Sequence, residues 1–121
     1  MTLITVYLHR TLKRNGLVNK VVFVTGSALG IGREVAISWA KESATIVALD
    51  IDAVENKTTH SQVESAGGTC HSYTCDIGDR EAVRAVFDDL NGKIDHIDLL
   101  INNAAVYGDT KLTSADWDTQ T

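Results

Sequence analysis

Three glycines within eight residues are spaced as a phosphate-binding turn requires. Residues 25–32 read Thr-Gly-Ser-Ala-Leu-Gly-Ile-Gly, between a run of β-branched residues and a helical pattern. Such a turn lets a ligand approach the backbone where no Cβ intervenes, and it presents N–H groups at the positive end of the helix dipole. We therefore expect Gly26, Gly30 and Gly32 to bind the pyrophosphate of a dinucleotide. A purely structural turn, which is the alternative, would need only one or two of these glycines.

Asp50 follows the turn at the distance expected of a ribose-binding carboxylate. It stands 18 residues after Gly32, at the end of the apolar run 44–49. A carboxylate at that place can accept hydrogen bonds from the two hydroxyls of an adenosine ribose. A solvated strand end is the alternative interpretation of Asp50. Asp52 competes for the same role, but Glu55 three residues later favours a helix cap for Asp52.

The residues beside Asp50 and the turn favour NAD over NADP. A carboxylate repels a 2′-phosphate, and Leu29 and Ile51 stand where a basic residue could otherwise pair with that phosphate. Arg33 weakens this argument, because it lies in the first turn of the helix that the glycines open. We predict NAD as the cofactor and consider NADP the weaker candidate.

Short apolar runs alternate with helical patterns along the chain. We predict strands at 21–25, 44–49, 69–75 and 97–101, and helices at about 31–40, 52–66 and 79–90. This alternation predicts an α/β fold: a partial doubly wound (Rossmann-type) parallel sheet, with strand order 3-2-1-4 and helices on both faces. The mixed run 69–75 suits an edge strand. The apolar run 97–101 suits a strand buried on both faces, yet no strand follows it, so we expect an exposed apolar edge there.

The composition is that of a globular protein. The chain has 121 residues, of which 44% are hydrophobic and 22% charged, which excludes disordered, collagen-like and coiled-coil classes. A formal net charge of -5 argues against nucleic acid as a partner. Cys70 and Cys75 are expected to be reduced thiols on opposite faces of a strand, and no metal site is predicted.

The first 17 residues are expected to form an extension ahead of a truncated NAD-binding domain at 18–121. Helical spacing of Leu3, Ile4, Tyr7, Leu8 and Leu12 allows an amphipathic helix, and a disordered leader is the alternative. The apolar run precedes the basic residues, which is the reverse of a secretory signal, and it is too short to span a membrane. We therefore predict a cytoplasmic protein.

Four motifs together resemble the short-chain dehydrogenase/reductase family. They are Thr25-Gly26-x-x-x-Gly30-Ile31-Gly32, Asp50, Cys75-Asp76-Ile77 and Asn102-Asn103-Ala104-Ala105, and the resemblance covers about residues 18 to 118. Ala105 stands where the family usually has glycine. The resemblance implies a hydrogen bond from the adenine amino group to Asp76, support of the adenine ring by the Ile77 backbone, and contacts of Asn103 and Ala104 with the ribose on the nicotinamide side.

The cofactor-binding residues that follow from the motifs and from the resemblance lie in four short segments. They are Gly26, Ser27, Leu29, Gly30, Ile31, Gly32, Asp50, Ile51, Asp76, Ile77, Asn103 and Ala104. The alternative interpretations are a turn or cap for Asp76 and an Asx turn for Asn102 and Asn103.

The resemblance implies a parent enzyme that transfers hydride between NAD(H) and an alcohol or carbonyl substrate. The family's catalytic Ser and its Tyr-x-x-x-Lys belong to segments beyond a helix that would begin near Trp117, so we expect this chain alone to be catalytically incompetent. Tyr107 and Lys111 match the spacing only locally. The alternative is a complete, non-catalytic nucleotide-binding or interaction module. A partner or a second copy would then cover its exposed fourth strand.

Overall fold

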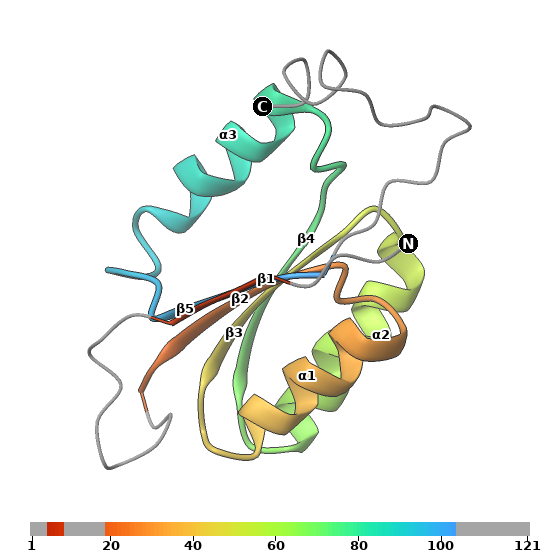
Figure 1. Cartoon of the computed structure of the whole chain (residues 1–121), viewed down its shortest axis with the longest axis vertical. Helices are drawn as coiled ribbons and strands as arrows, with labels where there is room; N and C mark the ends of the chain where they lie inside the picture. The colour runs from red at the N-terminus through yellow and green to blue at the C-terminus, as the bar shows by residue number, and fades with distance from the viewer. Residues whose placement is uncertain (1–4, 9–18, 104–121) are drawn as a thin grey trace.

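A five-stranded sheet forms the centre of the molecule in a computed structural model that describes residues 5–8 and 19–103 (Figure 1). The strands are β1 (Thr5–Leu8), β2 (Val21–Thr25), β3 (Thr45–Asp50), β4 (Thr69–Thr74) and β5 (Leu99–Asn102), in the spatial order β1-β5-β2-β3-β4. The four strands β2 to β5 run parallel to their neighbours among themselves. The predicted α/β fold and its strand order 3-2-1-4 are therefore confirmed, with β4 at one edge.

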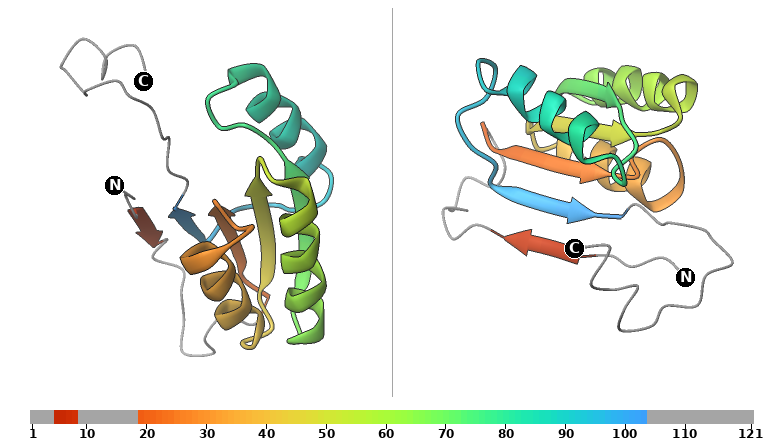
Figure 2. Two further views of the ribbon diagram at one scale, coloured as in Figure 1. Left: turned by 90° about the vertical axis from the view of Figure 1, so that its right-hand side faces the viewer. Right: turned by 90° about the horizontal axis from the view of Figure 1, so that it is seen from above.

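Helices cover both faces of this sheet. Helices α1 (Gly30–Ala40) and α2 (Ala53–Ser65) lie on one face, and α3 (Arg80–Leu90) lies on the other (Figures 1 and 2). The Asp52 carboxylate accepts a hydrogen bond from the Glu55 N–H at 3.0 Å, and the Asp79 carboxylate accepts from the first turn of α3, so both predicted caps are confirmed. None of these three helices is long and apolar enough to cross a bilayer.

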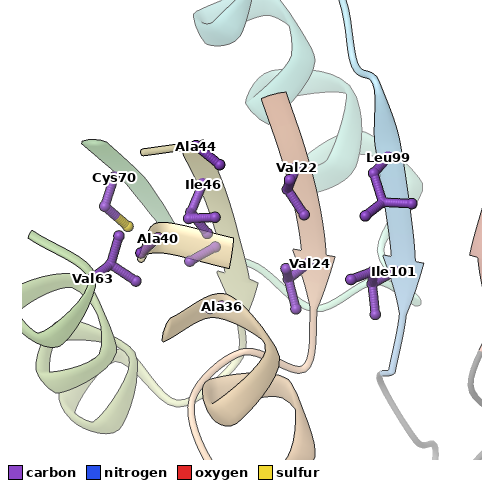
Figure 3. Packing of buried hydrophobic residues seen from close by; sticks show 11 residues of the cluster. Val22, Val24, Ala36, Ala40, Ala44, Ile46, Val63, Cys70, Leu99 and Ile101 are labelled. Atoms are coloured by element: carbon purple, nitrogen blue, oxygen red, sulfur yellow. The ribbon is translucent and has the colours of Figure 1, made fainter. Parts of the chain in front are cut away.

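The core consists of two apolar layers, one on each face of the sheet. Because successive side chains of a strand point to opposite faces, Val22 and Val24 of β2 pack toward α1 and α2, whereas Val21 and Phe23 pack toward α3. Figure 3 shows the first layer, in which Ile46 of β3 lies between Val22 of β2 and Cys70 of β4. Burying each such side chain stabilises the fold by roughly 1.5–3 kcal/mol.

The two cysteines belong to different layers. Cys70 packs in the layer under α1 and α2, and Cys75 packs in the layer under α3, so their predicted placement on opposite faces is confirmed. Burial, assisted by the nearby Glu64 carboxylate, raises the pKa of Cys70 to about 12. Burial also raises the pKa of Cys75. Both side chains therefore remain protonated thiols near neutral pH and are poor nucleophiles. In the ranges that the structure describes, no group of three or more His, Cys, Asp or Glu side chains could hold a metal ion.

β1 corrects two expectations about the edge of the sheet. Thr5–Leu8 pairs antiparallel with β5, Thr5 opposite Asn102 and Leu8 opposite Leu99 (Figure 2). These residues form a strand and not the expected amphipathic helix or disordered leader, and β5 is not an exposed edge. The physical reason is that an uncovered β5 would leave a row of backbone N–H and C=O groups unpaired. The helix expected near Trp117 and the pair Tyr107 and Lys111 lie outside the described residues.

Gly32 allows α1 to pack directly on the turn that precedes it. A Cβ atom at Gly32 would lie 1.8 Å from the carbonyl oxygen of Gly26 and 2.8 Å from Nδ2 of Asn103. Gly26 cannot withdraw easily, because its N–H donates to the carbonyl of Leu49 in β3 at 2.8 Å. The first turn of α1 therefore accepts only glycine at this place.

We expect loss of β1 to expose β5. Replacing residues 5–8 by Gly-Ser-Gly-Ser keeps the chain length but removes the strand preference of Thr, Val and Tyr. The free energy of unfolding should fall by about 1–2 kcal/mol, and the protein should associate as its concentration rises, since β5 becomes an open edge. Urea unfolding and sedimentation velocity measure the two effects. Unchanged values in both experiments would show that β1 does not cover β5 in solution.

We expect Gly32→Ala to lower the free energy of unfolding by about 3 kcal/mol or more, because the added methyl group overlaps the backbone. Gly92→Ala is the matched control, since a Cβ at Gly92 meets no atom within 4 Å, and its effect should stay within about 0.5 kcal/mol. Urea unfolding followed by circular dichroism measures both. Equal stability of the two variants would contradict the close approach of α1 to the turn.

Candidate functional site

The residues predicted to bind a cofactor meet at the carboxyl edge of the sheet. Because β2 to β5 point the same way, the segments that follow them lie along a single edge. The glycine turn follows β2, Asp50 ends β3, Asp76 and Ile77 follow β4, and Asn103 follows β5. Ala104 lies outside the described residues.

The amino end of α1 differs from those of the other two helices. Its N-cap residue, Leu29, makes no side-chain hydrogen bond to the first turn, and that turn carries no acidic residue. Gly30 has a φ of 59°, and a Cβ added there would meet nothing within 4 Å. The first N–H groups of a helix need partners from outside it, so this open amino end can accept an anionic group.

Asp50 holds the glycine turn against β3. Its Oδ2 accepts a hydrogen bond from the Ala28 N–H at 2.9 Å, and its Oδ1 accepts one from the Asp52 N–H, also at 2.9 Å. The side chain is therefore anchored and is not the solvated strand end of the alternative interpretation. Each carboxylate oxygen can accept a second hydrogen bond. A ligand hydroxyl can therefore bind Asp50 while both backbone bonds persist.

Two buried polar residues of α2 support the turn from behind. The Ser27 hydroxyl donates to Oδ1 of Asn56 at 2.6 Å, and the Thr59 hydroxyl donates to the Ser27 carbonyl at 2.8 Å. Asn56 also donates to the carbonyl of Ala48 in β3 at 3.1 Å. The side chain of Ser27, which the resemblance places at the cofactor, is thus fully buried and occupied by Asn56.

The sequence reasoning missed Asn56 and Thr59. Both are buried, at 2% and 0% exposure, although they are polar residues in a helix with few apolar ones. A signal was present, because Asn56, Thr59 and the buried Val63 are spaced by three and four residues and so share one helix face. Polar residues on the buried face of a helix indicate that the backbone they cover needs hydrogen-bond partners.

Exposed apolar side chains gather along the same edge. The large hydrophobic residues left open to solvent there are Leu29 (54%), Ile31 (53%), Ile51 (67%) and Ile77 (37%). Ile31, which the helical pattern also places on the apolar face of α1, is therefore not part of the core. Apolar side chains grouped at a surface that also carries a carboxylate indicate a ligand-binding surface.

Asp76 forms the turn that is its alternative interpretation, because its Oδ1 accepts a hydrogen bond from the Gly78 N–H at 2.8 Å. Its side chain is exposed at the same edge as Ile77. The turn orients the carboxylate without removing it from solvent, so the two interpretations are compatible.

Asn103 brings an unsatisfied acceptor to the site. Its N–H donates to the Thr25 hydroxyl at 3.1 Å, and its side-chain amide donates to the Gly26 carbonyl at 3.1 Å. Its Oδ1 is buried and has no hydrogen-bond partner in the described part of the chain. A buried acceptor left without a donor costs about 1–3 kcal/mol, and a ligand hydroxyl would satisfy it. The neighbouring Asn102 is structural, since its Oδ1 accepts from the Thr25 hydroxyl at 2.9 Å.

Sequence comparison finds relatives of one kind. A family model described as short chain dehydrogenase matches residues 20–120. The chain is 37% identical over 102 residues to a 3beta-hydroxysteroid dehydrogenase of Mediterraneibacter gnavus, covering 81% of this chain and 37% of that protein. It is 34% identical over 94 residues to epidermal retinol dehydrogenase 2 of Mus musculus, covering 77% and 30%. The chain thus spans less than half the length of these curated relatives.

Solved structures agree with the sequence relatives. A hydroxysteroid dehydrogenase from Escherichia coli superimposes with a TM-score of 0.71 at 30% identity, covering 85% of this chain and 45% of that one. A short chain dehydrogenase from Mycobacterium paratuberculosis bound to NAD gives 0.59 at 30% identity, covering 63% and 33%. A metagenomic short-chain oxidoreductase in complex with NADP gives 0.72 at 28% identity, covering 86% and 49%.

The family model extends over most of the chain, and it includes every described segment at the carboxyl edge of the parallel strands. The relatives reported above, from sequence and from structure, include hydroxysteroid dehydrogenases in both comparisons. This chain belongs to the short-chain dehydrogenase family of oxidoreductases.

Proposed function

We propose that this chain is the NAD-binding portion of an oxidoreductase that transfers hydride between NAD(H) and an alcohol or carbonyl substrate. The observation that carries the proposal is the gathering of exposed apolar side chains beside the open amino end of α1. Family membership adds support, because the similar solved structures include complexes with NAD and with NADP. We also propose a cytoplasmic location, which the free thiols of Cys70 and Cys75 support.

In this proposal the adenosine half of the cofactor lies across β3 and β4. Asp50 accepts hydrogen bonds from the ribose hydroxyls, Ile51 and Ile77 contact the adenine ring, and Asp76 accepts from its amino group. The apolar side chains would lose contact with water on binding, which favours binding by about 25 cal/mol per Å² of apolar surface buried.

The phosphates and the second ribose lie over β2 and β5 in the same proposal. The backbone of Gly26, Gly30 and Gly32 faces the pyrophosphate at the positive end of α1, with Leu29 and Ile31 beside it. Asn103 accepts from the ribose on the nicotinamide side, to which Ala104 would also contribute. The bound nicotinamide ring supplies the hydride chemistry.

NAD is the proposed cofactor because of the charge at the ribose. The Asp50 carboxylate is anchored by two backbone N–H groups, so it cannot swing away from the ribose 2′ position when a phosphate approaches. A dianionic phosphate beside a carboxylate is repelled strongly at short distance. A 2′-hydroxyl instead donates a hydrogen bond to it.

We expect calorimetric titration to show tighter binding of NAD than of NADP. Asp50→Asn keeps an acceptor for Ala28 or Asp52 but removes the charge, so NAD affinity should fall by about tenfold and NADP affinity should not. Asp88→Asn, on the exposed side of α3, is the control with the same chemical change and should leave both affinities unaltered. Equal or tighter binding of NADP by the unaltered protein would refute the cofactor assignment.

We expect the 121-residue protein to bind NAD without reducing it. The general acid/base pair of the family is not among the matched motifs, and loss of such a group typically costs about 10²–10⁴ in rate. The measurement is absorbance of the reduced cofactor with a panel of primary, secondary and steroid alcohols. Turnover above the rate in buffer would overturn the proposed separation of binding from catalysis.

A further inference from the structure

Arg33 lies in the first turn of α1, close to the residues that hold Asp50. The Ala28 N–H donates to Oδ2 of Asp50 at 2.9 Å. The carbonyl of the same residue lies 3.3 Å from the Thr59 hydroxyl, which accepts the hydrogen bond of Arg33 Nε at 2.9 Å. Ala28 and the Thr59 hydroxyl thus connect the Arg33 guanidinium to the Asp50 carboxylate at the proposed ribose site.

Two residues of α2 bind this guanidinium. Its Nη2 donates to Oε2 of Glu55 at 2.9 Å and to the Glu55 carbonyl, also at 2.9 Å. Together with the bond to Thr59, three hydrogen bonds fix the direction of the planar group. The Arg33 side chain is only 17% exposed, whereas that of Glu55 is 40% exposed.

The Glu55 carboxylate is available to Arg33 because Asp50 accepts the hydrogen bond of the Asp52 N–H. In a capping box the glutamate side chain would return to the N–H of the cap residue. Here the Asp52 N–H donates to Asp50 instead, at 2.9 Å. The Glu55 carboxylate therefore pairs with Arg33.

Building on the proposed binding of a dinucleotide, we propose that Glu55 is a specificity-determining residue. Its carboxylate is the one charged group among the three acceptors that bind the Arg33 guanidinium on α2, and it thereby withholds the guanidinium from a 2′-phosphate on the adenosine ribose. Discrimination against that phosphate then has two parts: Asp50 repels it, and Glu55 keeps a cation from neutralising it. An arginine without an acidic partner is well suited to bind a phosphate. The effect of Glu55 should therefore be largest when the Asp50 charge has been removed.

The experiment measures the affinities of ADP-ribose and of 2′-phospho-ADP-ribose by titration calorimetry, since these probes carry the adenosine half only. The unaltered chain should prefer ADP-ribose. Asp50→Asn should narrow the preference, and Asp50→Asn combined with Glu55→Ala should strengthen binding of the 2′-phosphorylated probe by about a further tenfold. Glu55→Gln, which keeps the shape of the side chain, should give a smaller gain in the same direction.

Two further variants separate release of Arg33 from a simple loss of negative charge. Glu64→Ala in the Asp50→Asn background removes a carboxylate from the same helix, at an exposed site paired with His60, and should give no gain. Arg33→Gln added to the Asp50→Asn, Glu55→Ala protein should abolish the gain while ADP-ribose still binds. A gain that persists without Arg33, or that Glu64→Ala reproduces, would overturn the inference.

The same titrations test the role of Glu55 separately from the proposed dinucleotide site. If the unaltered chain binds ADP-ribose and Glu55→Ala changes neither affinity in the Asp50→Asn background, only the role of Glu55 is wrong. If the unaltered chain binds neither probe, the proposed dinucleotide site is wrong, and the role of Glu55 fails with it.

Discussion

The hydrogen bond from the Thr59 hydroxyl to the carbonyl of Ser27 sits where three elements meet. Ser27 and Ala28 are buried in the glycine turn, so their carbonyls must find donors in a neighbouring element. Helix α2 provides them on its buried face, while Asp50 at the end of β3 receives the Ala28 N–H. These side-chain supports add to the backbone hydrogen bond from the Gly26 N–H to the Leu49 carbonyl of β3, and together they hold the turn in place. The position of α2 is therefore coupled directly to the shape of the site.

Local patterns were sufficient for the elements that local interactions determine. β2 has the predicted bounds, because a run of five consecutive buried residues indicates a strand whichever strands lie beside it. The caps at Asp52 and Asp79 were also predictable, since a cap bonds to a residue two or three positions away. The strand order was predictable as that of half a doubly wound fold, the fold that alternating strands and helices indicate.

The features that were missed depend on residues far apart in the chain. β1 pairs with β5, a strand more than ninety residues later. The helical spacing of the apolar residues near the start of the chain does not indicate that partner. Asn56 and Thr59 look like ordinary solvated positions until the glycine turn is placed against α2. The restraint on Arg33 was equally invisible, since it needs a contact between the first turns of two different helices. In each case, a long-range contact overrides a local preference.

The antiparallel direction of β1 also decides where material joined to the front of this chain would go. Thr5 lies opposite Asn102, at the end of β5 that leads to Asn103 and the carboxyl edge, whereas Leu8 lies opposite Leu99 at the far end. A dye, peptide or affinity handle attached ahead of Thr5 is therefore tethered beside the candidate site. Short tethers of this kind raise the local concentration of an attached group to about the millimolar range. The front of the chain is thus the natural place to anchor a reporter or a competing ligand, and a poor place for an inert purification tag.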